Sequence, residues 1–124
     1  MIEAEVVIVP PGGGEMDYTI SMEFPALPRE GDYISIVRGL NKNKSYSDET
    51  LEKTGSEDFI VRRVKWSCGS MIDANVEDRL TCDVTIECEY ALSPYSSESH
   101  KKNAELHYQY RGKSKPRSFD NSGY

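Results

Sequence analysis

The chain has 124 residues and carries 15 Lys and Arg against 21 Asp and Glu, a formal net charge of −6 at pH 7. This length allows one domain of ordinary size and excludes two. The acidic balance argues against simple non-specific binding to nucleic acid or to a membrane surface. No apolar run approaches the length of a membrane span, and the first residues lack the pattern of a signal peptide, so we expect a cytoplasmic protein.

Alternation of apolar and polar residues predicts β-strands through most of the chain. Residues 2–8 form the first apolar face, residues 18–24 alternate strictly, residues 33–37 form a shorter strand, and residues 80–90 form the longest. Proline and glycine clusters at 10–14 and 25–32 separate the early strands, as turns do. These connections favour an antiparallel meander.

The segment 59–68 changes phase part of the way along. Its apolar residues at 59 and 61 share one parity, whereas those at 64, 66 and 68 share the other. One extra residue at Arg62 or Arg63 restores the register, which is what a β-bulge does. Bulges bend strands, and strongly bent strands close small barrels. We therefore expect an all-β fold, a small antiparallel barrel or strongly curved sheet, with residues 69–78 as the connection to the long strand.

Three segments do not carry a plain strand pattern. Residues 39–58 form a loop much longer than a hairpin needs, and their polar composition favours disorder. Residues 104–110 alternate, which favours a strand, although Ser97 and Glu98 are suited to begin a helix. Residues 112–124 have no periodicity. We expect one barrel-like domain over residues 1–111, followed by a flexible basic tail over residues 112–124.

Two short stretches resemble a pattern found in other proteins. Residues 24–34 read Phe-Pro-Ala-Leu-Pro-Arg-Glu-Gly-Asp-Tyr-Ile, and residues 59–66 read Phe-Ile-Val-Arg-Arg-Val-Lys-Trp. An aromatic-Pro-x-Leu-Pro-x-x-Gly-Asp turn followed by a Phe-x-Val-x-x-Val-x-Trp strand resembles small, mostly uncharacterised bacterial and phage β-proteins. The resemblance implies a compact SH3-like barrel of about six strands and transfers no catalytic residue. The chain departs from it by the long 39–58 loop and by everything after residue 92.

The cysteines and histidines do not form a recognisable metal site. Cys82 and Cys88 are separated by about 20 Å of extended strand, too far for one zinc ion or for a disulfide. Cys68 is able to face Cys82 across the hairpin, but the odd cysteine count and the inward positions favour reduced core thiols. His100 and His107 have no cysteine pair at ligand spacing nearby. We expect neither a metal nor another cofactor.

No motif points to catalysis. The glycines at 12–14 are followed by acids and a strand, whereas a phosphate loop leads into a helix. No isolated acid lies on an apolar face where its pKa would be raised for general acid catalysis, and no nucleophile elbow is present. We therefore expect a non-enzymatic protein.

Charge is distributed unevenly along the chain. Residues 1–92 carry a net charge of −9, and residues 93–124 carry +3. The candidate partner-binding residues are the acids at outward strand positions: Glu3, Glu5, Glu23, Asp83, Glu87 and Glu89. Such a face is suited to docking on a basic protein surface, as inhibitors and immunity-type proteins do. The alternative is a solvated sheet face that discourages aggregation.

The basic residues of the tail offer a second candidate surface. Four cations fall within seven residues: Arg111, Lys113, Lys115 and Arg117. A basic arm binds phosphate backbones in a salt-sensitive way, so a nucleic-acid-associated protein is one alternative function. A tail that folds back on its own acidic body is favoured over this, because that attraction is intramolecular. A structural subunit of a larger assembly, joined to another copy through a strand edge, is a third hypothesis.

Overall fold

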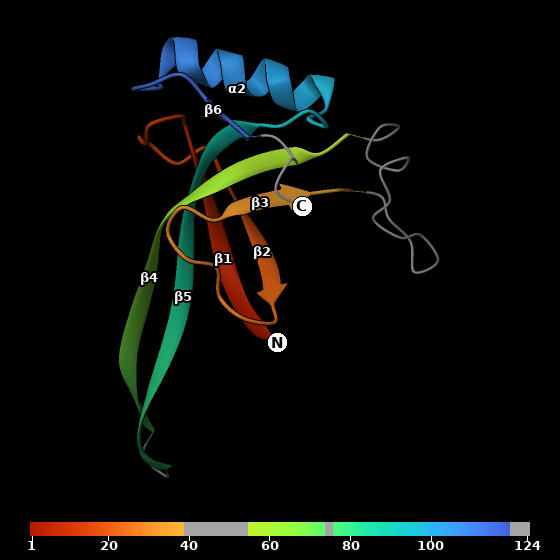
Figure 1. Ribbon diagram of the computed structural model, residues 1–124. Helices are drawn as coiled ribbons and strands as arrows, with labels where there is room; N and C mark the ends of the chain where they lie inside the picture. Colours follow the sequence, from red (N-terminus) through yellow and green to blue (C-terminus); the bar gives the residue numbers. More distant parts are fainter. Residues whose placement is uncertain (39–54, 74–75, 120–124) are drawn as a thin grey trace.

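The structure, a computed structural model, describes residues 1–38, 55–73 and 76–119, which form a small all-β fold with one helix (Figure 1). The elements are β1 (Ile2–Val9), β2 (Tyr18–Phe24), β3 (Tyr33–Ile36), β4 (Glu57–Asp73), β5 (Val76–Leu92), α2 (Glu98–Tyr110) and β6 (Arg117–Ser118). The strands make one curled, half-barrel sheet in the order β2-β1-β5-β4-β3, with β6 paired to β5. The predicted all-β class and curved sheet are confirmed.

The hydrophobic core lies on the inner face of the curled sheet. It is built from alternate positions of β1, β4 and β5, together with one helical residue: Ala4, Val6, Ile8, Phe59, Val61, Val84, Ile86, Cys88, Tyr90 and Ala104. Half-buried apolar side chains of β2 and β3 pack against this set. The period-two pattern of the sequence therefore identified the buried face of β1 and that of β5 from Val84 onward, whereas Leu80 and Cys82, expected on the same face, are exposed.

The centre of the sheet departs from the predicted antiparallel meander. β1 pairs with β2 in antiparallel fashion, but it pairs with β5 in parallel, from Glu5 opposite Thr85 to Val9 opposite Glu89. β6 is also parallel to β5. The physical reason for this central position of β1 lies at its end, where Val9 is as fully buried as Ile8. Apolar residues at both parities are typical of a central strand that is covered on both faces.

The predicted bulge is confirmed, and the strands that follow it are longer than expected. The β4–β5 register shifts between Val61 and Arg63. Residues 69–73 and 76–78, expected to be a connecting loop, instead continue β4 and β5 as a hairpin. The pairing of β3 with β4 ends at Ile60, and that of β1 with β5 begins at Thr85. Residues 64–73 and 76–84, which we call the hairpin arm, therefore project beyond the sheet (Figure 1).

The strand predicted at 104–110 is wrong, because this segment belongs to α2. Ser97 caps the helix by accepting a 3.1 Å hydrogen bond from the His100 N–H, as the alternative interpretation had suggested. His100 and Ala104, four residues apart, face the sheet, whereas Leu106 and Tyr110 are exposed. The alternation in the sequence therefore did not mark a buried strand face. The helix covers one end of the half-barrel (Figure 1) and is too short to cross a membrane.

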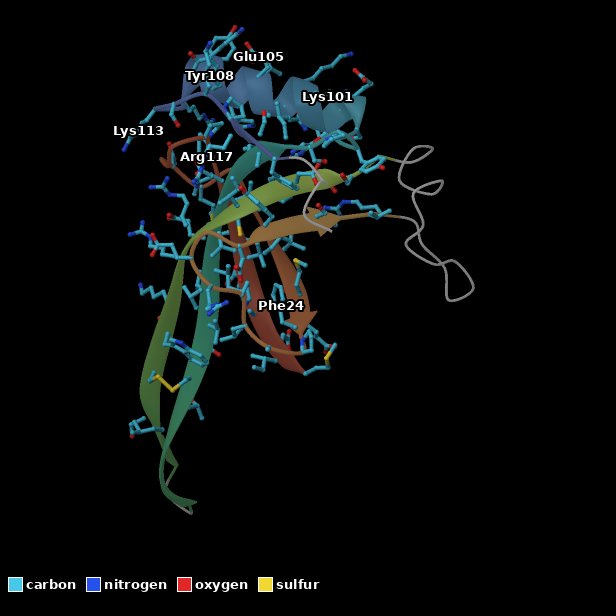
Figure 2. The ribbon with its side chains drawn as sticks, in the orientation of Figure 1. Phe24, Lys101, Glu105, Tyr108, Lys113 and Arg117 are labelled. Carbon is cyan, nitrogen blue, oxygen red and sulfur yellow. A yellow bond between two sulfur atoms is a disulfide. The ribbon has the colours of Figure 1, made fainter. Side chains whose placement is uncertain are left out.

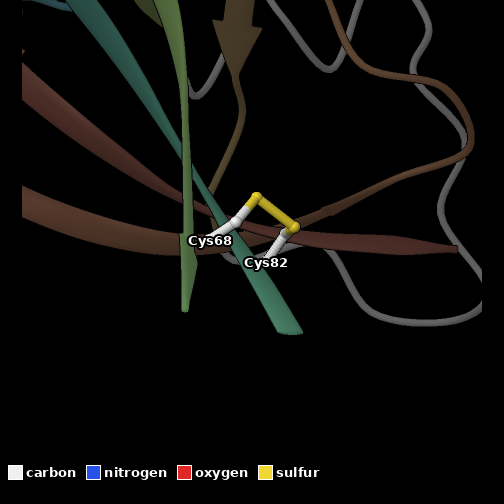
Figure 3. The surroundings of a disulfide bond; sticks show 2 residues. All are labelled: Cys68 and Cys82. Carbon is white, nitrogen blue, oxygen red and sulfur yellow. A yellow bond between two sulfur atoms is a disulfide. The ribbon is translucent and has the colours of Figure 1, made fainter. Parts of the chain in front are cut away.

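The expectation of three reduced, inward thiols is wrong for two of them. Cys68 and Cys82 form a disulfide between β4 and β5 (Figure 3), and both residues are exposed. They continue the inner face of the sheet, but they lie on the hairpin arm, where the other strands no longer cover that face. Cys88 is a free, buried thiol. The disulfide cross-links the two strands of the arm at a point where no other strand of the described residues lies beside either of them.

The end of the chain is only partly the flexible tail that the sequence predicts. Residues 117 and 118 form β6 beside Ala91 and Leu92, and the Phe119 ring stacks on Tyr33 with centroids 4.1 Å apart. The Phe119 N–H donates to the Leu92 carbonyl at 2.9 Å. Residues 117–119 therefore dock on the sheet. Residues 120–124, and residues 39–54 of the predicted long loop, lie outside the described part of the chain, whereas Glu57 and Asp58 begin β4.

Candidate functional site

Four of the six predicted partner-binding acids share the outer face of the sheet. Glu3 lies directly opposite Glu23 across the β1–β2 pair, and Glu5 lies opposite Thr85 of β5. Asp83 is two residues before Thr85, so it projects from the same face. All four acids are exposed, and none takes part in an ion pair among the described residues. We call Glu3, Glu5, Glu23 and Asp83 the acidic face.

The other two predicted acids are held inside the fold. The Glu89 side chain is only 4% exposed; it accepts a hydrogen bond from the Gly12 N–H and forms an ion pair with Arg117. Glu87 pairs with Arg62 at 3.1 Å and with Arg63 at 3.0 Å. The expectation that Glu87 and Glu89 belong to an open binding surface is therefore wrong, because their charges are satisfied by arginines of this chain.

This network of charges joins segments that are distant in the sequence. Arg62, at the bulge, lies within 3.7 Å of Glu89 as well as pairing with Glu87. Its guanidinium lies against the glycine loop that follows β1: a side chain at Gly13, where φ is +100°, would come within 2.8 Å of it. The hydrogen bond from Arg63 to Glu87 raises the pKa of Arg63. The bulge thus positions two arginines over β5, and the glycine loop makes room for one.

The predicted nucleic-acid-binding residues are not a free basic arm. Arg111 ends α2, and the N–H of Lys113 donates to the Pro11 carbonyl at 2.9 Å. Arg117 pairs with the buried Glu89, as expected for a tail that folds back on the acidic body. Figure 2 shows Lys113 and Arg117 on the segment that returns from the end of α2 along the sheet. Arg111, Lys113 and Lys115 remain exposed.

A fully buried carboxylate, missed by the sequence reasoning, positions the start of the helix. Asp58 of β4 is 0% exposed, and its oxygens accept hydrogen bonds from four hydroxyls. The donors are Ser35 at 2.6 Å, Ser56 at 2.9 Å, Ser93 at 3.0 Å and Ser96 at 2.5 Å. Buried charges persist only when they are hydrogen-bonded in this way. The cluster of serines at 93–97 was the available signal. Enclosure on all sides makes Asp58 a structural group.

A second polar cluster joins α2 to the sheet. The Tyr90 hydroxyl donates to Asp17 Oδ2 at 2.6 Å, and His107 Nε2 lies 3.3 Å from the same oxygen, with its ring stacked on Tyr90. His100 Nε2 lies 2.8 Å from the Ala91 carbonyl oxygen and 3.1 Å from the backbone nitrogen of Asp58, so this ring nitrogen ties the helix to β4 and β5. Burial first, and then the hydrogen bond to Asp17, raise the pKa of Tyr90. The helix is therefore anchored by histidines.

Burial also suppresses the reactivity of two further groups. It raises the pKa of Cys88 to about 12, with a smaller contribution from the charge of Glu87. It likewise raises the pKa of Tyr18 to about 12, with Glu57 next in importance. Both groups are therefore neutral at physiological pH, and a buried neutral thiol is a poor nucleophile. Among the residues that the structure describes, no three His, Cys, Asp or Glu side chains form a metal-binding group.

The hairpin arm carries two exposed large apolar side chains. Trp66 is 56% exposed and Leu80 is 77% exposed. A groove of about 700 Å³, lined in part by Arg63, Lys65, Trp66 and Thr85, runs along the base of the arm. The acidic face borders this base, because Asp83 is the register partner of Ser67.

Comparison with protein-family models, curated proteins and solved structures found no match for this chain.

Proposed function

We propose that this chain is a non-enzymatic protein-binding module that docks on a basic partner surface through its acidic face. The observation that carries the proposal is the juxtaposition of Glu3 and Glu23 on neighbouring strands, where both are exposed and neither forms an ion pair within the described part of the chain. The arginines of the neighbouring strands are occupied with Glu87 and Glu89 instead. The sheet thus neutralises one group of acids internally and leaves the other open.

The open acids are unfavourable for the isolated fold. Like charges directly opposite each other in a sheet destabilise it. A cation at Thr19, Ser21 or Thr85 would relieve this repulsion, but each of these outward neighbours is uncharged. A partner that brings lysines or arginines onto the face supplies the missing charges. Such complementarity raises the association rate and excludes wrongly charged partners, which suits an inhibitor or immunity-type protein.

The experiment compares two variants that have the same net charge. In the first, Glu3, Glu5, Asp83 and Glu23 become Gln, Gln, Asn and Gln. In the control, four exposed acids outside the acidic face, Glu15, Glu30, Glu98 and Glu105, all become Gln. Each variant and the unmodified chain are immobilised and used to capture proteins from the cells that produce the chain, and the captured proteins are quantified by mass spectrometry.

The proposal requires a basic protein that the unmodified chain and the control retain and that the acidic-face variant loses. Retention should weaken as salt is added, because exposed charges are screened. Equal retention by all three proteins would refute the proposed surface. Loss with both variants would show that only net charge matters, and this would also refute a specific face.

A further inference from the structure

β2 forms one end of the curled sheet and leaves an edge open. Among the described residues its only strand partner is β1 (Figure 1). Proteins usually protect such edges with proline or lysine, with a short strand or by covering them. β3, at the other end of the sheet, is only four residues long, whereas β2 has seven residues and contains neither proline nor lysine. The edge of β2 is therefore suited to pairing with a further strand.

A hydrogen bond at the end of β1 shows which backbone groups this edge presents. The Asp17 N–H donates to the Ile8 carbonyl at 2.8 Å, so the backbone groups of Ile8 point toward β2. Successive residues of an antiparallel strand point their backbone groups to opposite sides, so the even-numbered residues of β1 bond to β2. Their register partners are the even-numbered residues of β2. The odd-numbered residues of β2 therefore present their N–H and C=O groups to the open edge: Thr19, Ser21 and Glu23.

We propose that two copies of this chain pair through their β2 edges, antiparallel, about a two-fold axis at Ser21. A symmetric pairing that uses all of β2, Tyr18–Phe24, is centred on residue 21. Residue 21 is also one of those whose backbone groups face outward, so the two Ser21 residues form a hydrogen-bonded pair at the axis. Thr19 of each copy then lies opposite residue 23 of the other. Each such pair exchanges two backbone hydrogen bonds across the interface.

The partner is a second copy because the inner face of this edge complements itself. In the proposed register the aromatic residues at the two ends of β2 fall opposite each other, and apolar residues fall opposite each other between them. Cross-strand pairs of these kinds stabilise antiparallel sheets. The four side chains are only half-buried in a single chain, so pairing covers apolar surface that the fold itself leaves exposed. The pairs are Tyr18 with Phe24, and Ile20 with Met22.

The outer face of the edge is compatible with the same register. Its single charged residue, Glu23, falls opposite the uncharged Thr19, so no acid lies directly opposite another acid across the interface. Pairing places the acidic faces of the two copies on one continuous outer surface. The inference does not rest on the proposed function, because it requires only the edge of β2 and no basic partner.

The first test compares two substitutions at the axis. Ser21→Pro removes an N–H that faces the open edge and that β1 does not use, a position at which edge strands tolerate proline. Ser21→Thr keeps this N–H and is the matched control. Light scattering from about 1 μM to about 1 mM should show the mass of the unmodified chain and of the control rising from 14.0 kDa toward twice this value.

We expect Ser21→Pro to raise the dimer Kd at least about tenfold relative to Ser21→Thr, because one hydrogen bond is lost from each copy. Equal dimerisation by the two variants would contradict edge pairing. A mass of the unmodified chain that stays monomeric at every concentration would overturn the inference.

A second test does not depend on the tolerance of proline. Ser21→Cys places one thiol from each copy at the axis, and Thr19→Cys is the matched control; both positions are exposed on the outer face of β2. At the axis the two Cα atoms are about 5.5 Å apart, within the range that a disulfide spans. The two thiols introduced at position 19 are four residues apart along the paired strands, about 13 Å, which is too far.

Each cysteine variant is incubated with glutathione disulfide. Two thiols at the axis form one disulfide and lose two protons and two electrons, which reduce one glutathione disulfide to two glutathione molecules. A cross-linked dimer on a non-reducing gel is expected from Ser21→Cys and not from Thr19→Cys. Equal cross-linking in the two variants, or none in Ser21→Cys, would overturn the proposed pairing.

Discussion

Replacing one acid of the acidic face should make the fold more stable while it weakens partner binding. Glu3→Lys converts the repulsion with Glu23 into an attraction between directly opposite side chains. At the ~5 Å spacing of such pairs, one unit-charge interaction in water is about 0.8 kcal/mol, so the change of sign is worth about 1.6 kcal/mol. Both side chains are exposed and flexible, which lowers the expected gain in unfolding free energy to about 0.5–1 kcal/mol.

Urea unfolding of Glu3→Lys and the unmodified chain measures this gain. The difference should be largest at about 0.01 M salt and nearly vanish at about 1 M, because the screening length falls from about 30 Å to about 3 Å. Glu30→Lys is the control, because it makes the same change of charge at an exposed acid outside the acidic face. Equal stabilisation by both variants, or a gain that is insensitive to salt, would refute the repulsion on which the proposed function rests.

Three further predictions concern the groups that the fold holds inside. Glu89→Gln should destabilise the fold by about 2–3 kcal/mol, because buried charge-assisted hydrogen bonds are lost. The same loss should expose the segment at Arg117 to trypsin. Unchanged stability would contradict the role of this network. Ser97→Ala should lower stability by about 1 kcal/mol through loss of the helix cap, measured by thermal unfolding, and Ser97→Asp should retain it. The raised pKa of Cys88 favours the neutral thiol in the fold, so its contribution to stability is complete below pH ~9 and declines up to pH ~12, by at most about 1.4 kcal/mol per pH unit. The unfolding free energy, measured by urea titration at several pH values in this window, should fall less steeply with pH in Cys88→Ala than in the unmodified chain. An identical slope in the two proteins would contradict this contribution of Cys88.

The strands and the bulge were predictable because their signals are local. Period-two alternation along β1, β2 and β5 reports burial of one face, and the change of parity before Val64 reports an extra residue. The helix was mispredicted for an equally local reason. Its buried positions carry His100 and Ala104 rather than large apolar residues, so the helical period is hidden in the hydrophobic pattern.

The candidate site was only partly predictable, because the partners of its acidic side chains come from segments that are distant in the sequence. Alternation placed the acids on outward positions, but nothing near Glu89 in the sequence indicates that Gly12 and Arg117 enclose it. The Cys68–Cys82 disulfide was an allowed alternative in the sequence but was not the favoured one, since choosing it over reduced thiols requires the register of the hairpin past residue 69. The parallel contact of β1 with β5 likewise follows from tertiary packing.

The most direct test of the acidic face is the association rate with the captured partner as a function of salt. If the face steers docking, the rate of the unmodified chain should fall steeply between about 0.01 M and 1 M salt. The variant neutralised at Glu3, Glu5, Glu23 and Asp83 should start from a lower rate and show a much shallower slope. Parallel slopes for this variant and the unmodified chain would contradict the claim that these four acids form the binding surface.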